Sequence, residues 1–248
     1  MIDNWMISHR VKDDWLSDCR DAATSDGSFL TFKRMPTLGY ITENRHARHA
    51  SQYWAMAKSL RPECISILPA LAEADKVGCP LEADVAVVDG HSLSGATASS
   101  ALVCSQIIHL FGNRPYRIAE IGPGYGNLAH CLKLFGLVEQ YTFFDLIAPS
   151  MLQRRYIRSF GWDGIWPALG DKEPGAYDLS LSHSSLSELN DEAKAHYAAR
   201  VLQRSTYGFH VWNFGGTGMG MTRCNSLFPD DLSGVWDNCY VHGNVNTI

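Results

Sequence analysis

The sequence lacks the features that mark membrane, secreted and nucleic-acid-binding proteins. No run of about 18 apolar residues is free of charges, as a membrane-spanning helix requires. The opening stretch MIDNWMISHRVKDDW has no apolar signal-peptide core. Lys and Arg form no long run and the formal net charge is −5, which disfavours a broad phosphate-binding surface. We therefore expect a cytoplasmic protein that binds neither membranes nor nucleic acid.

The chain also lacks any pattern of paired cysteines. Its seven cysteines are scattered, odd in number and never spaced as CxxC. This excludes a disulfide framework and a zinc site of the usual spacing, and it fits reduced thiols that act as small buried apolar residues.

What the sequence does contain is enough apolar material for a full core. The chain has 248 residues, of which 46% are hydrophobic, and no internal repeat stands out. Residues 1–85 read as helical segments at 11–23, 42–60 and 62–78, the last ending at a C-cap glycine. We expect them to form an N-terminal helical region that serves as a lid, an acceptor pocket or the surface of a homodimer.

From Tyr116 onward, short apolar runs alternate with amphipathic stretches. This alternation predicts a doubly wound, Rossmann-like α/β domain over residues 86–248, with helices on both faces of a parallel sheet. Antiparallel strands are expected near the C-terminus, within 235–245. The expected parallel strands are 116–121, 140–146, 164–169, 177–183 and 207–214, and the expected helices are 127–136, 149–161 and 187–205.

The first of these strands leads into a glycine-rich loop. Glu120 is followed by Gly122, Gly124 and Gly126, and the next residue begins a helix. In a doubly wound sheet, ligands bind outside the carboxyl ends of the strands, so this loop is the expected binding site. A dinucleotide fingerprint would carry its third glycine at Asn127. The observed spacing therefore favours a ligand other than a pyrophosphate.

Two acidic residues follow later strands. Asp145 closes the run YTFFD, 19 residues after Gly126, close to the spacing expected for a carboxylate that binds a ribose diol. Asp171 follows the run GIWPAL, where it would accept a hydrogen bond from an adenine amino group. Either acid alone could be a turn or helix-cap residue, but their common position after successive strands indicates a nucleoside site.

Three segments that carry these residues resemble a known family. EIGPGYGNL, FFDL and ALGDKEPGAYDLSLSHSSLSEL are similar to the signature segments of class I S-adenosylmethionine-dependent methyltransferases. The E-I-G-P-G-Y-G form and the S-x-S-E-L segment resemble sugar O-methyltransferases of bacterial polysaccharide and natural-product pathways. The resemblance covers about residues 78–232 and is close over 117–190. Residues 1–75 match no family.

The resemblance implies a role for each motif residue. Glu120 would lie near the amino group of the methionine portion of S-adenosylmethionine, and the loop glycines Gly122, Gly124 and Gly126 would let the backbone approach it. Asp145 would bind the ribose hydroxyls. Leu146 would pack on the adenine and Asp171 would face its amino group. Ser182 and His183 would lie beneath the sulfonium and beside the acceptor.

The expected reaction is O-methylation of a small-molecule hydroxyl, most simply of a sugar or a sugar-bearing metabolite. His183 is the first candidate for a general base, with Glu188 and His210 as alternatives. The pairs Asp191–Glu192 and Asp230–Asp231 lack metal-site spacing, so no metal is expected. N- or C-methylation of another metabolite or peptide, and a non-catalytic partner subunit with this fold, stay open. A nicotinamide oxidoreductase is disfavoured by the glycine spacing.

Overall fold

The computed structural model describes residues 13–43, 47–162, 165–167, 175–212, 222–224 and 238–242. The N-terminal part is helical, as expected, and is followed by a short hairpin. Its elements are α1 (Asp13–Thr24), α2 (Asp26–Leu30), η2 (Phe32–Arg34), α3 (Pro36–Glu43), α4 (Ala47–Leu60), η3 (Pro62–Ile67), α5 (Leu68–Asp75), η4 (Glu82–Asp84), β1 (Val85–Val88) and β2 (His91–Ser94).

The rest of the described chain alternates between helices and strands. Its elements are α6 (Gly95–Phe111), β3 (Tyr116–Ile121), α7 (Asn127–Leu134), β4 (Val138–Phe144), α8 (Ile147–Arg158), β5 (Ile165–Pro167), β6 (Tyr177–His183), α9 (Ser185–Glu188), α10 (Asp191–Arg200), η5 (Leu202–Arg204), β7 (Ser205–Trp212), β8 (Thr222–Cys224) and β9 (Asn238–His242).

Within the described residues, the central sheet has seven strands in the order β5-β4-β3-β6-β7-β9-β8. Neighbouring strands from β5 to β7 are parallel. Strand β9 is antiparallel to both β7 and β8. The chain first builds outward from β3 to β4 and β5, and then returns to the other side of β3 to add β6 and β7. This reversal confirms the predicted doubly wound, Rossmann-like sheet and places its switch point between β3 and β6.

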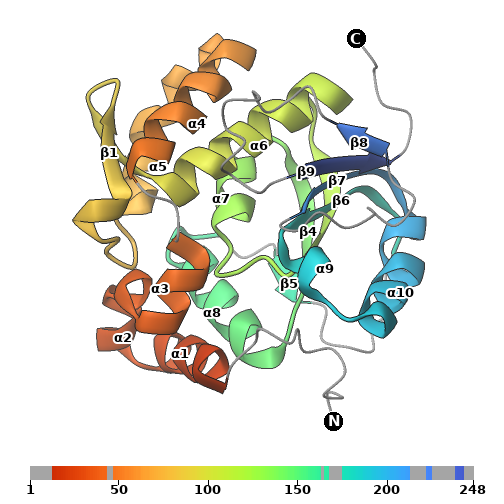
Figure 1. The fold of residues 1–248 in the computed structure, drawn as a ribbon, viewed down its shortest axis with the longest axis horizontal. Helices are drawn as coiled ribbons and strands as arrows, with labels where there is room; N and C mark the ends of the chain where they lie inside the picture. Colours follow the sequence, from red (N-terminus) through yellow and green to blue (C-terminus); the bar gives the residue numbers. More distant parts are fainter. Residues whose placement is uncertain are drawn as a thin grey trace.

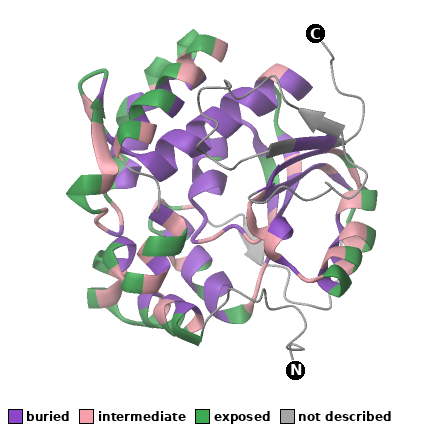
Figure 2. Ribbon diagram, in the orientation of Figure 1, coloured by how far each residue is buried: buried purple, intermediate pink, exposed green. Residues whose placement is uncertain are grey.

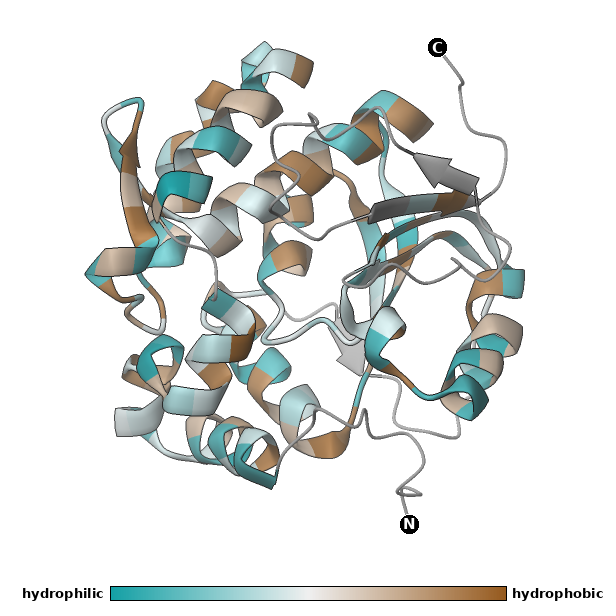
Figure 3. Cartoon of the chain, viewed as in Figure 1, coloured by the Kyte–Doolittle hydropathy of each residue, from teal (hydrophilic) through white to brown (hydrophobic). Residues whose placement is uncertain are grey.

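Helices cover both faces of the sheet. Successive side chains of a strand point to opposite faces, so each face presents apolar side chains that must be buried. Ile118 of β3 lies in the larger apolar core with helices α6, α7 and α8, whereas Ala119 lies in a smaller core with α9 and α10. Helix α6 is buried almost throughout, which explains its apolar composition (Figures 2 and 3). Figure 1 shows α1–α5 on the side of the molecule opposite α10.

The N-terminal helices share the larger core instead of forming one of their own. Trp15, Phe32 and Trp54 belong to the same buried cluster as Tyr125 and Tyr156, which follow β3 and β4. Helix α1 packs along α8, where the Arg155 guanidinium donates hydrogen bonds to the carbonyl oxygens at the end of α1. The N-terminal helical region therefore packs directly beside the glycine loop.

The structure corrects two expected helices. Residues 62–78 form η3 followed by α5, which ends at Asp75, and residues 187–205 are divided between α9, α10 and η5. The expected helix over 42–60 crosses residues 44–46, which lie outside the described residues. Asn190 caps α10, since its side chain accepts a hydrogen bond from Ala193 N at 2.8 Å. The stretch before α6 forms the β1–β2 hairpin, whose turn residues Asp89 and Gly90 both have positive φ.

Within the part of the chain that the structure describes, the helices are too short or too polar to span a bilayer.

Candidate cofactor site

The glycine loop connects β3 to α7 at the switch point of the sheet. Gly122, Gly124 and Gly126 have φ of +64°, +61° and +101°, a region that favours glycine. A Cβ on Gly122 would collide with the Ser185 side chain, whereas a Cβ on Gly124 would only touch the Thr42 methyl group at 3.6 Å. Gly122 and Gly124 are half-buried and Gly126 is buried. The first two glycines therefore present backbone at the open edge of the sheet.

Two serines, Ser182 at the end of β6 and Ser185 at the start of α9, hold this loop. The Ser185 hydroxyl donates to the Ile121 carbonyl oxygen at 2.5 Å and lies 3.2 Å from that of Gly122. The Ser182 hydroxyl lies 3.1 Å from the Ser185 hydroxyl and accepts from Leu186 N at 2.9 Å. Ser182 is buried, so its observed role is to connect the end of β6 to the loop. Its predicted contact with the cofactor stays a prediction.

Asp145 lies directly after β4, at the same edge of the sheet. Leu146 N donates to its Oδ1 at 2.7 Å and Gln153 Nε2 donates to its Oδ2, also at 2.7 Å. Gln153 Nε2 also lies 2.8 Å from the carbonyl oxygen of Gly124. Sequence reasoning missed Gln153, which belongs to the buried side of α8 and ties the acidic residue to the glycine loop.

The environment of Asp145 disfavours its charged form. Burial raises the pKa of the carboxyl group from 3.8 to about 7, although the Leu146 and Gln153 hydrogen bonds oppose this shift. Asp145 and Leu146 are nevertheless only half-buried. The carboxylate therefore combines fixed hydrogen-bond donors on its protein side with an accessible side, which suits the binding of a diol.

Glu120 is more deeply buried, with 1% of its surface exposed. The Tyr141 hydroxyl of the neighbouring strand donates to Glu120 Oε2 at 2.7 Å. Burial raises the pKa of Glu120 from 4.5 to about 8, the Tyr141 hydrogen bond opposes the shift and the Asp145 charge adds to it. A cationic group next to Glu120 would restore the charged form.

His183 ends β6 and is half-buried at the same edge. Ser184, directly after it, has φ +77°, an uncommon conformation for a non-glycine residue. The alternative base His210 is fully buried, with Nε2 3.3 Å from the Ser180 hydroxyl. Burial removes His210 from contact with an acceptor and leaves His183 and Glu188 as accessible candidates. Asp171, the predicted adenine contact, lies outside the described residues.

The N-terminal region supplies two residues that sequence reasoning did not connect with the loop. Thr42 lies over Gly124, and the Tyr125 hydroxyl donates to Glu43 Oε1 at 2.7 Å. The contacting pairs are 82 positions apart, so no local pattern announces them. Among the described residues, no group of three or more His, Cys, Asp or Glu side chains is arranged to hold a metal ion.

No family model matches the chain. No curated protein matches it either. Solved structures with similar folds include a Thermoplasma acidophilum protein (20% identity, TM-score 0.39), whose alignment covers 47% of this chain and 62% of the other. A proposed RNA methyltransferase from Pyrococcus horikoshii aligns at 11% identity and TM-score 0.45, covering 62% and 84% of the two chains. The M. capricolum protein TrmK, solved with S-adenosylhomocysteine, aligns at 15% identity and TM-score 0.40, covering 58% and 67%.

The chain thus spans less than two thirds of the length of the Thermoplasma protein. All three TM-scores are below 0.5, and the assignment of the fold rests on the order and direction of the strands.

Proposed function

We propose that the chain is an S-adenosylmethionine-dependent methyltransferase that methylates a hydroxyl of a small molecule, a sugar or a sugar-bearing metabolite. The observation that carries the proposal is that Gln153 donates hydrogen bonds both to the glycine loop and to Asp145. This bridge joins a half-buried carboxylate to half-buried loop backbone at the switch point of the sheet, where nucleoside ligands bind in doubly wound folds. The family resemblance of the same segments supplies the identity of the cofactor.

The residues present fit the chemical groups of that cofactor. Its ribose diol requires hydrogen-bond acceptors, which the Asp145 carboxylate provides. Its amino group requires an anionic partner, and the buried Glu120 regains its charge beside a cation. Gly122 and Gly124 offer backbone without side chains at the edge of the sheet. Leu146, half-buried next to Asp145, offers an apolar surface for the adenine ring.

When bound, S-adenosylmethionine supplies an electrophilic methyl group on a sulfonium. The work left to the chain is to orient an acceptor oxygen in line with that methyl group, which contributes about 7–11 kcal/mol in well-oriented systems. His183 would accept the proton that the acceptor hydroxyl loses when it is methylated. A positioned base of this kind contributes about 10²–10⁴-fold to the rate.

Binding of S-adenosylhomocysteine, measured by calorimetry, tests the cofactor assignment. Replacing Asp145 by Asn removes the charge that would bind the ribose, and we expect affinity to fall by about 10- to 150-fold. Asp178→Asn is the matched control, because Asp178 is a hydrogen-bonded carboxylate of β6 that pairs with Arg117 near the start of the strands. The control should bind like the wild type. Equal affinities in the wild type and Asp145→Asn would remove Asp145 from the site.

Turnover with a panel of sugar acceptors tests the finer assignment. His183→Ala should lower the rate at which S-adenosylhomocysteine is formed by about 10²–10⁴-fold and leave cofactor affinity near that of the wild type. Unchanged turnover would place the base elsewhere. Methylation of amine acceptors with no methylation of sugars would replace O-methylation by N-methylation.

A further inference from the structure

The glycine loop has one large side chain, Tyr125, and this side chain leaves the sheet for the N-terminal helices. Its ring lies 5.0 Å from that of Phe32 and 4.9 Å from that of Tyr156, both in edge-on geometry. Lys33 Nζ lies 5.4 Å from the centre of the same ring. Tyr125 is 2% exposed, so the N-terminal region encloses it.

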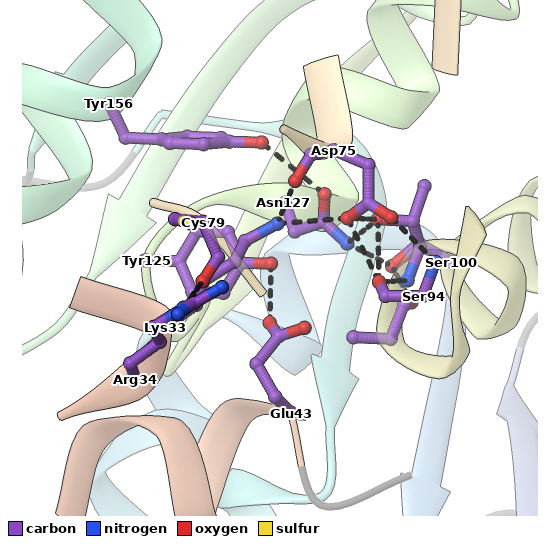
Figure 4. A network of polar contacts seen from close by, with 12 residues as sticks. Lys33, Arg34, Glu43, Asp75, Cys79, Ser94, Ser100, Tyr125, Asn127 and Tyr156 are labelled. Carbon is purple, nitrogen blue, oxygen red and sulfur yellow. Dashed lines mark hydrogen bonds and ion pairs between the residues drawn. The ribbon is translucent and has the colours of Figure 1, made fainter. Parts of the chain in front are cut away.

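The hydroxyl of Tyr125 donates to Glu43 Oε1 at 2.7 Å (Figure 4). Glu43 is the last residue of α3 and is 2% exposed. Its second oxygen, Oε2, is buried and has no hydrogen-bond partner among the residues that the structure describes. Thr42, the residue before it, covers Gly124 of the same loop. The end of α3 therefore contacts the loop at two successive residues.

The nearby buried cation Lys33 interacts with Glu43 through its charge, but its hydrogen bonds go to Asp75. Lys33 Nζ pairs with Asp75 Oδ1 at 2.8 Å and also donates to the Asp75 carbonyl oxygen at 2.8 Å. Asp75 in turn accepts from Ser94 and Thr97 at the start of α6. Burial raises the pKa of Glu43, and the Lys33 charge and the Tyr125 hydrogen bond oppose the shift. Glu43 is thus a buried carboxyl group that accepts a hydrogen bond from Tyr125 of the glycine loop.

We propose that Glu43 is a positioning residue of the cofactor site, which holds the glycine loop in its binding conformation through the hydroxyl of Tyr125. The inference rests on the proposed function, since it assigns the N-terminal helical region a share in the affinity for S-adenosylmethionine. The loop consists of residues with positive φ on either side of Tyr125 and gains rigidity only from its contacts. A side chain anchored at its middle lowers the conformational entropy that the loop loses when a ligand binds.

The test measures S-adenosylhomocysteine affinity by calorimetry in Tyr125→Phe, Glu43→Ala and Glu43→Gln, well below the unfolding midpoint of each variant. The first two remove one hydrogen bond, and we expect them to weaken binding by about two- to tenfold. Glu43→Gln keeps an acceptor for the Tyr125 hydroxyl and should bind close to the wild type. The double variant Tyr125→Phe/Glu43→Ala should bind no more weakly than the weaker single variant, because both remove the same contact.

Asp89→Asn is the matched control. It weakens another hydrogen bond of the N-terminal region, the 2.6 Å bond from Trp54 Nε1 to Asp89 Oδ2, away from the glycine loop. This control should lower the unfolding midpoint without changing the affinity. A rescue by Glu43→Gln together with an unaffected control supports the proposal, because a merely structural role would not separate the variants in this way.

Two results overturn the inference while leaving the proposed function intact. One is wild-type affinity in both Tyr125→Phe and Glu43→Ala. The other is a loss in Asp89→Asn as large as in those variants, which would reduce Glu43 to a contributor to general stability. A wild-type chain that does not bind S-adenosylhomocysteine at all would instead overturn the proposed function, and this inference with it.

Discussion

Glu120→Gln is the substitution whose consequences follow most directly from the structure. Glutamine has nearly the same shape as glutamate and keeps an oxygen that accepts the Tyr141 hydrogen bond, 2.7 Å long in the wild type. It removes only the ability to carry a charge on the central strand β3. Because this position is 1% exposed, water cannot replace the lost interactions of a charged group there.

The magnitude follows from the pKa of Glu120, which burial raises from 4.5 to about 8. The folded protein therefore keeps a proton on this group over a pH range in which the unfolded chain has released it. The contribution of Glu120 to stability is then greatest below pH 4.5, falls as pH rises through this window and is constant above about pH 8. At 1.36 kcal/mol per pKa unit, the total change is about 3–5 kcal/mol.

Urea unfolding followed by tryptophan fluorescence at pH 5, 7 and 9 measures this effect. The free energy of unfolding of Glu120→Gln, minus that of the wild type, should rise by about 1.4 kcal/mol per pH unit up to pH 8. Glu139→Gln, at an exposed position of the adjacent strand, is the control and should change the free energy of unfolding little. A difference that is the same at all three pH values for Glu120→Gln would refute the reasoning. The variant should also bind S-adenosylhomocysteine more weakly, since it cannot become an anion beside the amino group.

Two further predictions concern the loop and Asp145. Gly122→Ala should lower the free energy of unfolding by more than about 1–3 kcal/mol because φ is +64° and the new Cβ meets Ser185; Gly136→Ala, at φ +73° with open space around it, should cost less in the same denaturation experiment. The affinity for 5′-methylthioadenosine, which carries ribose but no amino group, should rise up to about tenfold per pH unit from pH 5.5 toward 7 and then level off, as the Asp145 carboxyl with pKa about 7 ionises. Asp145→Asn should remove that dependence in calorimetric titrations, and a persisting dependence would point to another group.

The parts of the site that could be predicted from sequence are those encoded within a few neighbouring residues. Strand β3, the glycine loop and the start of α7 form one continuous pattern of an apolar run, three glycines and a helical period. Asp145 could be found in the same way, because it directly follows the buried run of β4. These local signals are sufficient to place the candidate site at one edge of the sheet.

The rest of the site depends on contacts that no local pattern encodes. Gly122 must be glycine partly because Ser185, 63 positions later, fills the space of its side chain. Gln153 reads from sequence as an ordinary helix residue until α8 folds against the loop. Glu43 and Tyr125 each look like members of unrelated segments. In contrast, the Asp89-Gly90 turn of the β1–β2 hairpin is a local signal, because Asp-Gly is a typical hairpin dipeptide.

The most direct test of the central claim is the unfolding midpoint of the purified chain with S-adenosylmethionine, S-adenosylhomocysteine or NAD, each compared with no ligand. A ligand present at 100 times its dissociation constant stabilises the folded state by about 2.7 kcal/mol, which gives a clear upward shift. The account predicts this shift for both adenosyl compounds and none for NAD. A shift with NAD alone, or no shift with any of the three, would contradict it.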